Sequence, residues 1–570
     1  MNRFPALAFC FLTSGLLVPL QTSPEIPSVD FTQARSHELA PHRHTIPMAD
    51  VQQGFNQLEL TVTISPAGDV IGAEANAYSD VIRLWPQIKE EVLGWKFTPF
   101  QVNGQPATVR AQEYINFVPP ERLPKVHITP PTLRPDSTIA ITLRRSGCFG
   151  TCPDYAVTLT PKGILFNGST FVVAAGKHTA SVDPGQVRKL AARFIAADFY
   201  SMAPNYVAGV TDNPGYSLAI TIDGQKKEVE DYVGQWVGMP AVITELEEAV
   251  DELAQTNRWI KGDAGLVPSL KNEKYNFNAY EAQTVVKEAA SRGDAALVRE
   301  LLEAGVPLKP LPDPNPNDIK QSLSFAYVGW LTAASIHPET LQVLIEAHAS
   351  IQDQNDKDLA LAGAARSGNL EAVHALLAYG ANPNVDLTQL AMADSKPSMR
   401  MGPNPSGSVL IAAAESSNPE LVKEILHYQP NLEARDDHGR TALFAASESF
   451  RGNDDGTAAA ECVRLLVESG ANGNGRDDKG NTPLHNAHKA AVVKELIKLG
   501  ANVNARNDAG ETPIFTTIDP ETIAILVSHG ADLTLRNNKG ETTFEAAKRE
   551  GSYRSIALEQ ALKNLKNTQP

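Results

Sequence analysis

Residues 481–510 read NTPLHNAHKAAVVKELIKLGANVNARNDAG, and this stretch decides how the second half of the chain is organised. Thr482 is a preferred helix-capping residue, and Pro483 fits the first turn of a helix, where its missing N–H costs no hydrogen bond. A second helix is indicated by apolar residues at helical spacing, which are Val492, Val493, Leu496 and Ile497. Gly500 then ends this helix at a point that needs a positive φ angle. The stretch therefore predicts two helices followed by a turn.

The same pattern returns along the chain at a constant interval. Gly480, Gly510 and Gly540 are 30 residues apart, and related segments precede them at residues 439–443, 376–382 and 301–305. Residues 482–487 match the T-P-L-H-x-A signature at every defined position, so residues 280–566 resemble the ankyrin-repeat family. The resemblance implies an all-α solenoid of about seven units, the last of them a cap, that binds protein partners.

The projecting turns of such a solenoid are its predicted binding surface, because partners of the family usually contact them. The residues that recur at these turns are Arg435, Asp437, Arg476, Asp478, Arg506, Asp508 and Arg536. Alternatively, this arginine and aspartate column bridges adjacent turns. Two insertions, 308–324 and 385–408, fall at the same edge, and the second adds Met392, Met399 and Met401, which suit adaptable apolar contacts. Disordered decoration is the alternative for both insertions.

Residues 51–118 have the alternating apolar pattern of a small sheet. A hairpin is predicted around residues 58–71, a helix over 79–93 and a last strand over 108–117. The element W-x-F-x-P-x-x-x-N-G is formed by Trp95, Phe97, Pro99, Asn103 and Gly104. It is similar to the TonB carboxy-terminal domain family, which implies a small α+β fold that contacts envelope partners. We expect Trp95, Phe97 and Phe100 to fill the core of this domain.

Residues 137–260 predict a second α+β domain. Strands are expected to begin at Ile139 and to recur over 156–159, 164–166, 216–222 and 226–232, with helices over 184–197 and 240–256. The G-C-F-G-T-C-P-x-Y core at 147–155, together with residues 211–214 and 259–260, resembles a bacterial domain family of unknown function. That family implies no activity.

Cys148 and Cys152 are the two cysteines of this second domain. A C-x-x-x-C spacing within a turn predicts a structural disulfide in an exported protein. A redox site and a zinc site are the alternatives, although the former would favour C-x-x-C and the latter needs two more ligands. An anion pocket is a further hypothesis, formed by Arg144, Arg145, Tyr155 and Asp212. Cys462 lies on a repeat helix and is expected to be a buried free thiol.

The first residues of the chain predict export. Arg3 precedes an apolar run that ends at Val18, and polar residues follow, which is typical of a secretory signal peptide over 1–23. The alternative is an uncleaved segment that anchors the protein to the inner membrane. A periplasmic or secreted location follows, with no membrane span after cleavage. The remaining segments are interpreted as a tether, 24–50, and two linkers, 119–136 and 261–279.

Composition and motifs limit the classes of function that are consistent with the sequence. The 570 residues include 50 Lys and Arg against 66 Asp and Glu, a net charge of −16, which disfavours binding to nucleic acid. The chain contains no nucleophile elbow, phosphate loop or metal-ligand spacing, so no cofactor, metal or catalytic residue is predicted. We therefore expect two small α+β domains followed by an all-α ankyrin solenoid, acting as an exported scaffold that binds a protein partner. The alternatives are an enzyme or ligand sensor centred on 137–260 and a TonB-related envelope adaptor.

Overall fold

A computed structural model of the chain describes residues 28–29, 43–45, 57–75, 85–102, 105–118, 121–148, 151–311, 329–350, 352–388, 390, 406–448, 455–550 and 556–561. The predicted signal peptide lies outside the described residues, as do Met392, Met399, Met401 and most of both insertions. The chain divides into two compact units. One comprises residues 1–130, 197–213 and 229–245, and the other comprises 131–196, 214–228 and 246–570.

The amino-terminal sheet has five strands in the order β1-β7-β3-β4, with β2 also paired to β7. Its elements are β1 (Ser28–Val29), β2 (Arg43–Thr45), β3 (Gln57–Ile64), β4 (Val70–Ala75), α2 (Trp85–Leu93) and β7 (Val109–Val118), with a separate β5 (Gln101–Val102) and β6 (Gln105–Pro106) hairpin. β3 and β4 form the predicted antiparallel hairpin. Trp95, Phe97 and Phe100 are buried in one core with α2 and β3, so their predicted role as core residues is confirmed.

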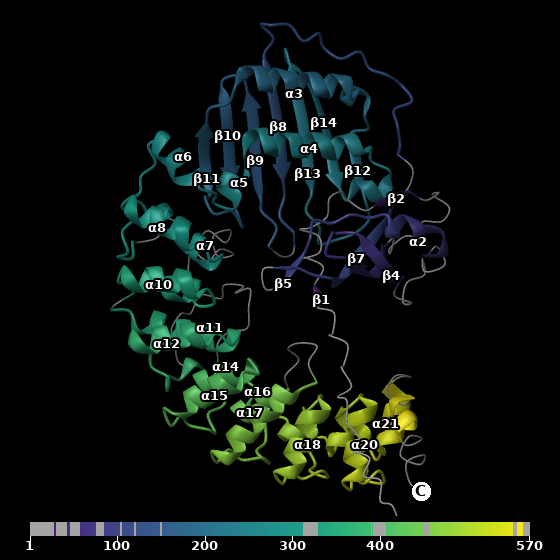
Figure 1. The fold of residues 1–570 in the computed structure, drawn as a ribbon, viewed down its shortest axis with the longest axis vertical. Coiled ribbons are helices and arrows are strands. Elements are labelled where there is room, and N and C mark those ends of the chain that lie inside the picture. The colour runs from purple at the N-terminus through teal and green to yellow at the C-terminus, as the bar shows by residue number, and fades with distance from the viewer. Residues whose placement is uncertain are drawn as a thin grey trace, which may run out of the picture. The chain divides into compact units, whose positions relative to one another are not determined.

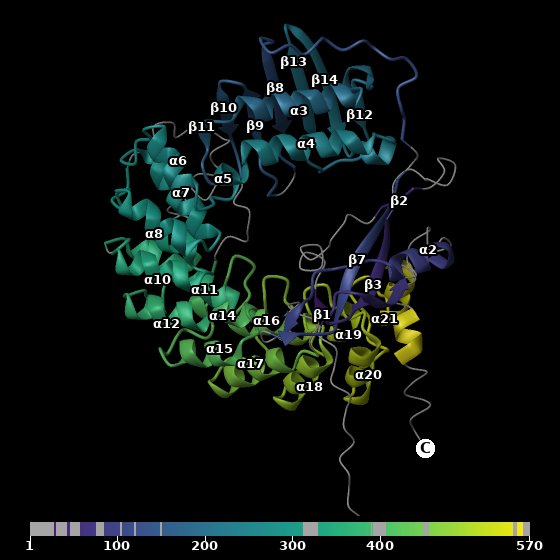
Figure 2. The same cartoon turned by 45° about the horizontal axis from the view of Figure 1, so that its top comes forward.

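The second sheet has seven strands in the order β11-β10-β9-β8-β13-β14-β12. Its strands are β8 (Ile139–Arg145), β9 (Tyr155–Thr160), β10 (Gly163–Gly168), β11 (Gly176–Ala180), β12 (Asn205–Val207), β13 (Tyr216–Ile222) and β14 (Gln225–Tyr232). Helices α3 (Pro184–Ala196) and α4 (Ala241–Ala254) lie against the same face of the sheet, while η3 (Phe199–Ser201) and η4 (Gly234–Val237) are single turns (Figure 2). Ile139, Ile141 and Leu143 point to the buried face, as the period of two predicts. The short strands β11 and β12 were not predicted.

The rest of the described chain is helical, which is consistent with ankyrin repeats (Figure 1). The repeat helices are paired as α7 (Tyr280–Ser291) with α8 (Ala295–Glu303), α9 (Trp330–Ala334) with α10 (Pro338–Glu346), α11 (Gln354–Ser367) with α12 (Leu370–Ala378), α14 (Val409–Glu415) with α15 (Pro419–Leu426), α16 (Ala442–Ser447) with α17 (Thr457–Glu468), η7 (Pro483–His485) with α18 (Ala490–Lys498), and α19 (Pro513–Thr516) with α20 (Pro520–Ser528). α21 (Thr543–Glu550) follows, and residues 556–561 are also helical.

Successive pairs stack in register. The first helix of each pair packs on the first helix of the next, as in α7 with α9 and α11 with α14, while second helices meet in the same way, as in α15 with α17. Each amphipathic pair thus buries its apolar side against its neighbours. The described part of the chain contains seven such pairs and α21, which is one more unit than the sequence predicted.

Residues 261–279 differ from their interpretation as a linker. They contain α6 (Leu266–Asn272), and Leu266, Val267 and Leu270 are buried there; the short helix α5 (Asn257–Ile260) precedes it. A helix of seven residues is too short to show a clear helical period. Pro268 lies in the first turn of α6, where a proline breaks no hydrogen bond.

Candidate functional site

The turns between repeats share one internal hydrogen-bond pattern. The Asp477 carboxylate accepts from the backbone N–H groups of Lys479 (2.9 Å) and Asn481 (2.8 Å). The equivalent acceptors in the other turns are Asp436, Asn507 and Asn537. Gly480 completes the turn with a φ of 71°, and a Cβ there would lie 2.3 Å from an oxygen of Asp508 in the next repeat. These turns are therefore locally rigid and closely stacked.

The predicted arginine column bridges adjacent turns. The Arg435 guanidinium donates to the carbonyl oxygen of Arg476 at 2.8 Å, and Arg476 donates to that of Arg506 at 2.8 Å. Arg506 donates to the carbonyl oxygen of Arg536 at 2.7 Å, and Arg536 bonds to Glu545 at 2.8 Å. Two roles were predicted for these arginines, namely contact with a partner and bridging of adjacent turns. The structure shows the bridging contacts. We call this chain of contacts the arginine ladder.

The aspartates of the same turns remain exposed. Asp437 accepts from Ser406 (2.9 Å) and His438 (2.8 Å), and the His438 hydrogen bond holds the pKa of Asp437 below its usual value. Asp478 lies 3.9 Å from Arg435, while the backbone N–H of Asp508 donates to Lys479 of the preceding turn. Asp437, Asp478 and Asp508 therefore present carboxylates from stacked turns, and we call them the turn aspartates.

One turn also brings together groups with metal-ligating chemistry. Asp436, Asp437 and His438 have ligand atoms within 4.8 Å of one another, and no metal-ligand spacing in the sequence predicted this cluster. Their contacts have another explanation, because Asp436 is buried and binds Arg440 at 2.7 Å and 2.8 Å. Asp437 and His438 bond to each other. The cluster is thus accounted for as the internal structure of a turn.

His485, the histidine of the T-P-L-H-x-A signature, links the start of its own repeat to the next repeat. The backbone N–H of Thr482 donates to its Nδ1 (3.0 Å), and its Nε2 lies 3.0 Å from the carbonyl oxygen of Glu511 in the next repeat. The neutral ring with a proton on Nε2 satisfies both contacts. Burial, the largest cause, lowers the pKa of His485.

Acidification is therefore expected to destabilise the repeats through His485. Between about pH 7.5 and pH 5.5 the unfolded histidine gains a proton that the folded one resists, so about 1 kcal/mol of unfolding free energy is lost as the pH falls. Urea denaturation of the full chain at both pH values measures this loss. In His485→Gln the loss should shrink by that amount, even though the variant is less stable at pH 7.5. A pH dependence as large as that of the wild type would contradict the assignment to His485. The loss would then come from another group, such as His488, whose pKa is also lowered and which the variant retains.

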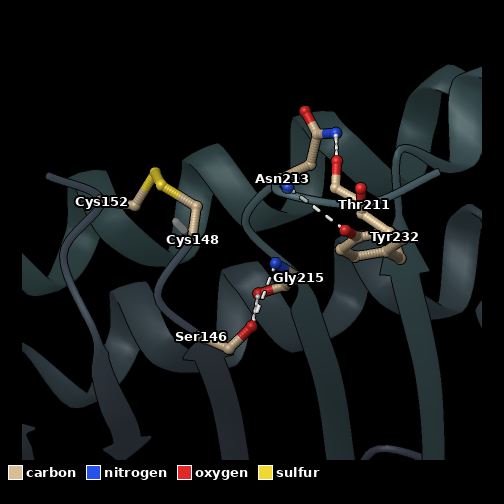
Figure 3. The surroundings of a disulfide bond; sticks show 7 residues. All are labelled: Ser146, Cys148, Cys152, Thr211, Asn213, Gly215 and Tyr232. Atoms are coloured by element: carbon tan, nitrogen blue, oxygen red, sulfur yellow. Dashed lines mark hydrogen bonds between the residues drawn. A yellow bond between two sulfur atoms is a disulfide. The ribbon is translucent and has the colours of Figure 1, made fainter. Parts of the chain in front are cut away.

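The sheet domain contains the predicted disulfide, between Cys148 and Cys152 in the turn from β8 to β9 (Figure 3). Ser146, at the base of this turn, bonds to Gly215 through both its backbone and its hydroxyl group. Asn213 bonds to the carbonyl oxygen of Thr211 and to the hydroxyl of Tyr232 (Figure 3). The other described cysteine, Cys462, is buried with a free thiol as predicted, and burial raises its pKa to about 12.

The hypothetical anion pocket does not form as a group of four. Arg144 and Arg145 are consecutive on β8 and so point to opposite faces, with Arg144 exposed. Arg145 lies opposite Tyr155 on β9 and opposite Tyr216 on β13, and its guanidinium stands over the Tyr216 ring at 5.3 Å. Asp212 is exposed, and its carboxylate accepts from Thr211. Of the four, only Arg145 and Tyr155 line a common cavity.

That cavity has a volume of about 1270 Å³ and extends from the end of the sheet to the first repeat helix. Tyr155 donates to both carboxylate oxygens of Asp251 on α4, at 2.8 Å and 2.7 Å, and burial raises the pKa of each group. Arg258 on α5 and Arg292, the residue that follows α7, bring further guanidinium groups. Asp251, Arg258 and Arg292 were not predicted from the sequence, because no local motif marks them.

Two parts of the chain match known families. Residues 409–507 match the family described as ankyrin repeats (3 copies). Residues 139–254 match a family described as a domain of unknown function, DUF6438. A search of curated proteins finds no match. Among the helices that the structure describes, none combines the length and the apolar character needed to cross a membrane.

Proposed function

We propose that this protein is an exported, non-enzymatic scaffold that binds a protein partner through the turns of an ankyrin solenoid. The observation that carries the proposal is the row of turn aspartates, exposed on successive turns that the arginine ladder holds together. The match to ankyrin repeats supports a role in protein binding. A surface that is already ordered loses little conformational entropy on binding, which favours affinity.

Charge indicates what kind of partner fits. Residues 280–566 contain 27 Lys and Arg against 38 Asp and Glu, a net charge of −11. An acidic surface attracts a basic one and speeds the encounter of the two proteins, with a rate that falls as salt is added. We therefore propose a partner that presents lysine and arginine side chains to the turn aspartates.

The proposed location is the periplasm or the exterior of the cell. The apolar leader over 1–23 supports it, and the Cys148–Cys152 disulfide suits an oxidising compartment. We also propose that residues 51–118 form a TonB carboxy-terminal-like module that makes an accessory contact in the envelope. The sheet with one packed helix and the buried Trp95 and Phe97 support that assignment.

Neutralising the turn aspartates is expected to weaken partner capture. Asp437→Asn, Asp478→Asn and Asp508→Asn are combined in the full-length chain, which is used as bait in a crosslinked pull-down from the native envelope fraction. Exposed ion pairs contribute modestly, so the loss for three should be roughly 3- to 100-fold, and it should shrink in high salt.

The matched control removes the same number of negative charges from another part of the repeats. Glu303→Gln, Glu339→Gln and Glu371→Gln neutralise three exposed carboxylates on helices rather than on turns. This control should capture the partner as the wild type does. Equal capture by both triple variants would refute the turns as the binding surface.

A further inference from the structure

The cavity at the end of the seven-stranded sheet has the size and the walls of a ligand site. Its volume of about 1270 Å³ exceeds that of most small-molecule pockets, which are roughly 300–1,000 Å³. The sheet contributes Arg145, α4 contributes Glu248 and Glu252, α5 contributes Arg258, and the residue that follows α7 is Arg292. All these residues belong to one compact unit of the chain.

One of the guanidinium groups, that of Arg145, has unused hydrogen-bonding capacity. It stands over the Tyr216 ring, and its Nε donates to no partner in the described structure. Arg258 is already partly engaged, because its terminal nitrogens donate to the side chain of Gln255 and, at 3.5 Å, to the hydroxyl of Ser269. An N–H group removed from water without an acceptor costs free energy, and a carboxylate offers a guanidinium two acceptor oxygens in matching geometry. Arg292 differs, because it donates to the carbonyl oxygens of Ile260 (2.9 Å) and Phe171 (3.0 Å).

Acidic side chains line the same cavity and limit the charge of the ligand that it can bind. Glu248, Glu252 and Asp263 are exposed there, whereas Asp251 is already occupied by Tyr155 and Thr256. A polyanion would be repelled by these carboxylates. A molecule that carries both a carboxylate and an amino group would find a partner for each charge, because the cavity offers arginines for the carboxylate and carboxylates for the amino group.

We propose that this cavity binds a short zwitterionic peptide. Its carboxylate pairs with Arg145 and is attracted by the nearby charge of Arg258, its amino group faces the carboxylates of α4, and the side-chain amide of Asn257 suits its backbone groups. This site is separate from the turn aspartates and independent of the partner that they bind.

The test is calorimetric titration of the full-length protein with trialanine and with trialanine amide, which lacks the free carboxylate. We expect saturable binding of trialanine with a Kd of about 1 mM or lower, and at least about tenfold weaker binding of the amide. Arg145→Gln and Arg258→Gln should each weaken trialanine binding about tenfold. Arg144→Gln, one residue away on the opposite face of the strand, should leave it unchanged.

Three results would overturn the proposal. They are absence of saturable trialanine binding up to about 10 mM, equal binding of the amide, and equal losses in Arg144→Gln and Arg145→Gln. Titration with inorganic phosphate adds a fourth, because binding of phosphate without trialanine would show an anion site only. The variant with neutralised turn aspartates should retain trialanine binding, so the two proposals fail separately.

Discussion

Replacing Trp259 with alanine is expected to remove about 3–5 kcal/mol from the free energy of unfolding, the usual cost of deleting a large buried aromatic side chain. Trp259 is fully buried. Its ring stacks on Phe166 of β10 with centroids 4.9 Å apart and on His178 of β11 at 6.4 Å. Its carbonyl oxygen also accepts from the N–H of Ala174 at 2.9 Å. The residue therefore packs α5 against the edge of the sheet.

Trp259→Phe is the matched variant. The indole Nε1 is buried without a hydrogen-bond partner in the described structure, so phenylalanine loses packing volume but no polar contact. We expect it to cost roughly 1–2 kcal/mol. Urea denaturation of the full-length chain, followed by circular dichroism, compares the two variants. A loss in Trp259→Phe as large as in Trp259→Ala would contradict stacking as the source of stability.

The same region joins the sheet domain to the first repeats. The Nδ1 of His178 lies 2.9 Å from the Glu273 carboxylate, which also accepts from the N–H of Thr179 at 2.8 Å. Glu273 immediately follows α6, and His178 also packs against Tyr275. A segment that was interpreted as a linker is thus packed against the sheet domain.

The repeats could be predicted because their signals are local. Thr482, Pro483 and Gly500 act within a few residues of their own positions, and the 30-residue interval makes the pattern visible. The arginine ladder was only half predictable. The common phase of Arg476 and Arg506 shows in the sequence, but the carbonyl oxygens that accept from them are defined only when the repeats stack.

The cavity could not be predicted, because its parts are distant in sequence. Tyr155 and its partner Asp251 are 96 residues apart. Strand alternation alone, however, could have separated Arg144 from Arg145, since consecutive residues on a strand point to opposite faces. Asp212 was grouped with them by its motif rather than by any geometric signal.

Asp356→Ala is expected to cost about 3–5 kcal/mol, because it leaves buried donors of the neighbouring repeat without an acceptor. Asp356 lies on α11 and is 3 % exposed. Its carboxylate accepts from the backbone N–H groups of Leu331 (2.9 Å) and Thr332 (3.0 Å) at the start of α9, and from the hydroxyl groups of Thr332 and Ser350. Gly329, which precedes α9, supplies no capping side chain. Asp356 thus caps a helix of the preceding repeat.

Asp353→Ala, three residues away, is the matched control. Asp353 caps only its own helix, where it accepts from the N–H of Asp356 at 3.1 Å, so its loss should cost about 1 kcal/mol. Hydrogen exchange locates the difference, since amides of residues 330–346 should exchange on the order of 100-fold faster in Asp356→Ala. Those amides should change by less than about tenfold in Asp353→Ala. Equal exchange in the two variants would show that α9 is stabilised by packing alone and that the capping carboxylate contributes nothing.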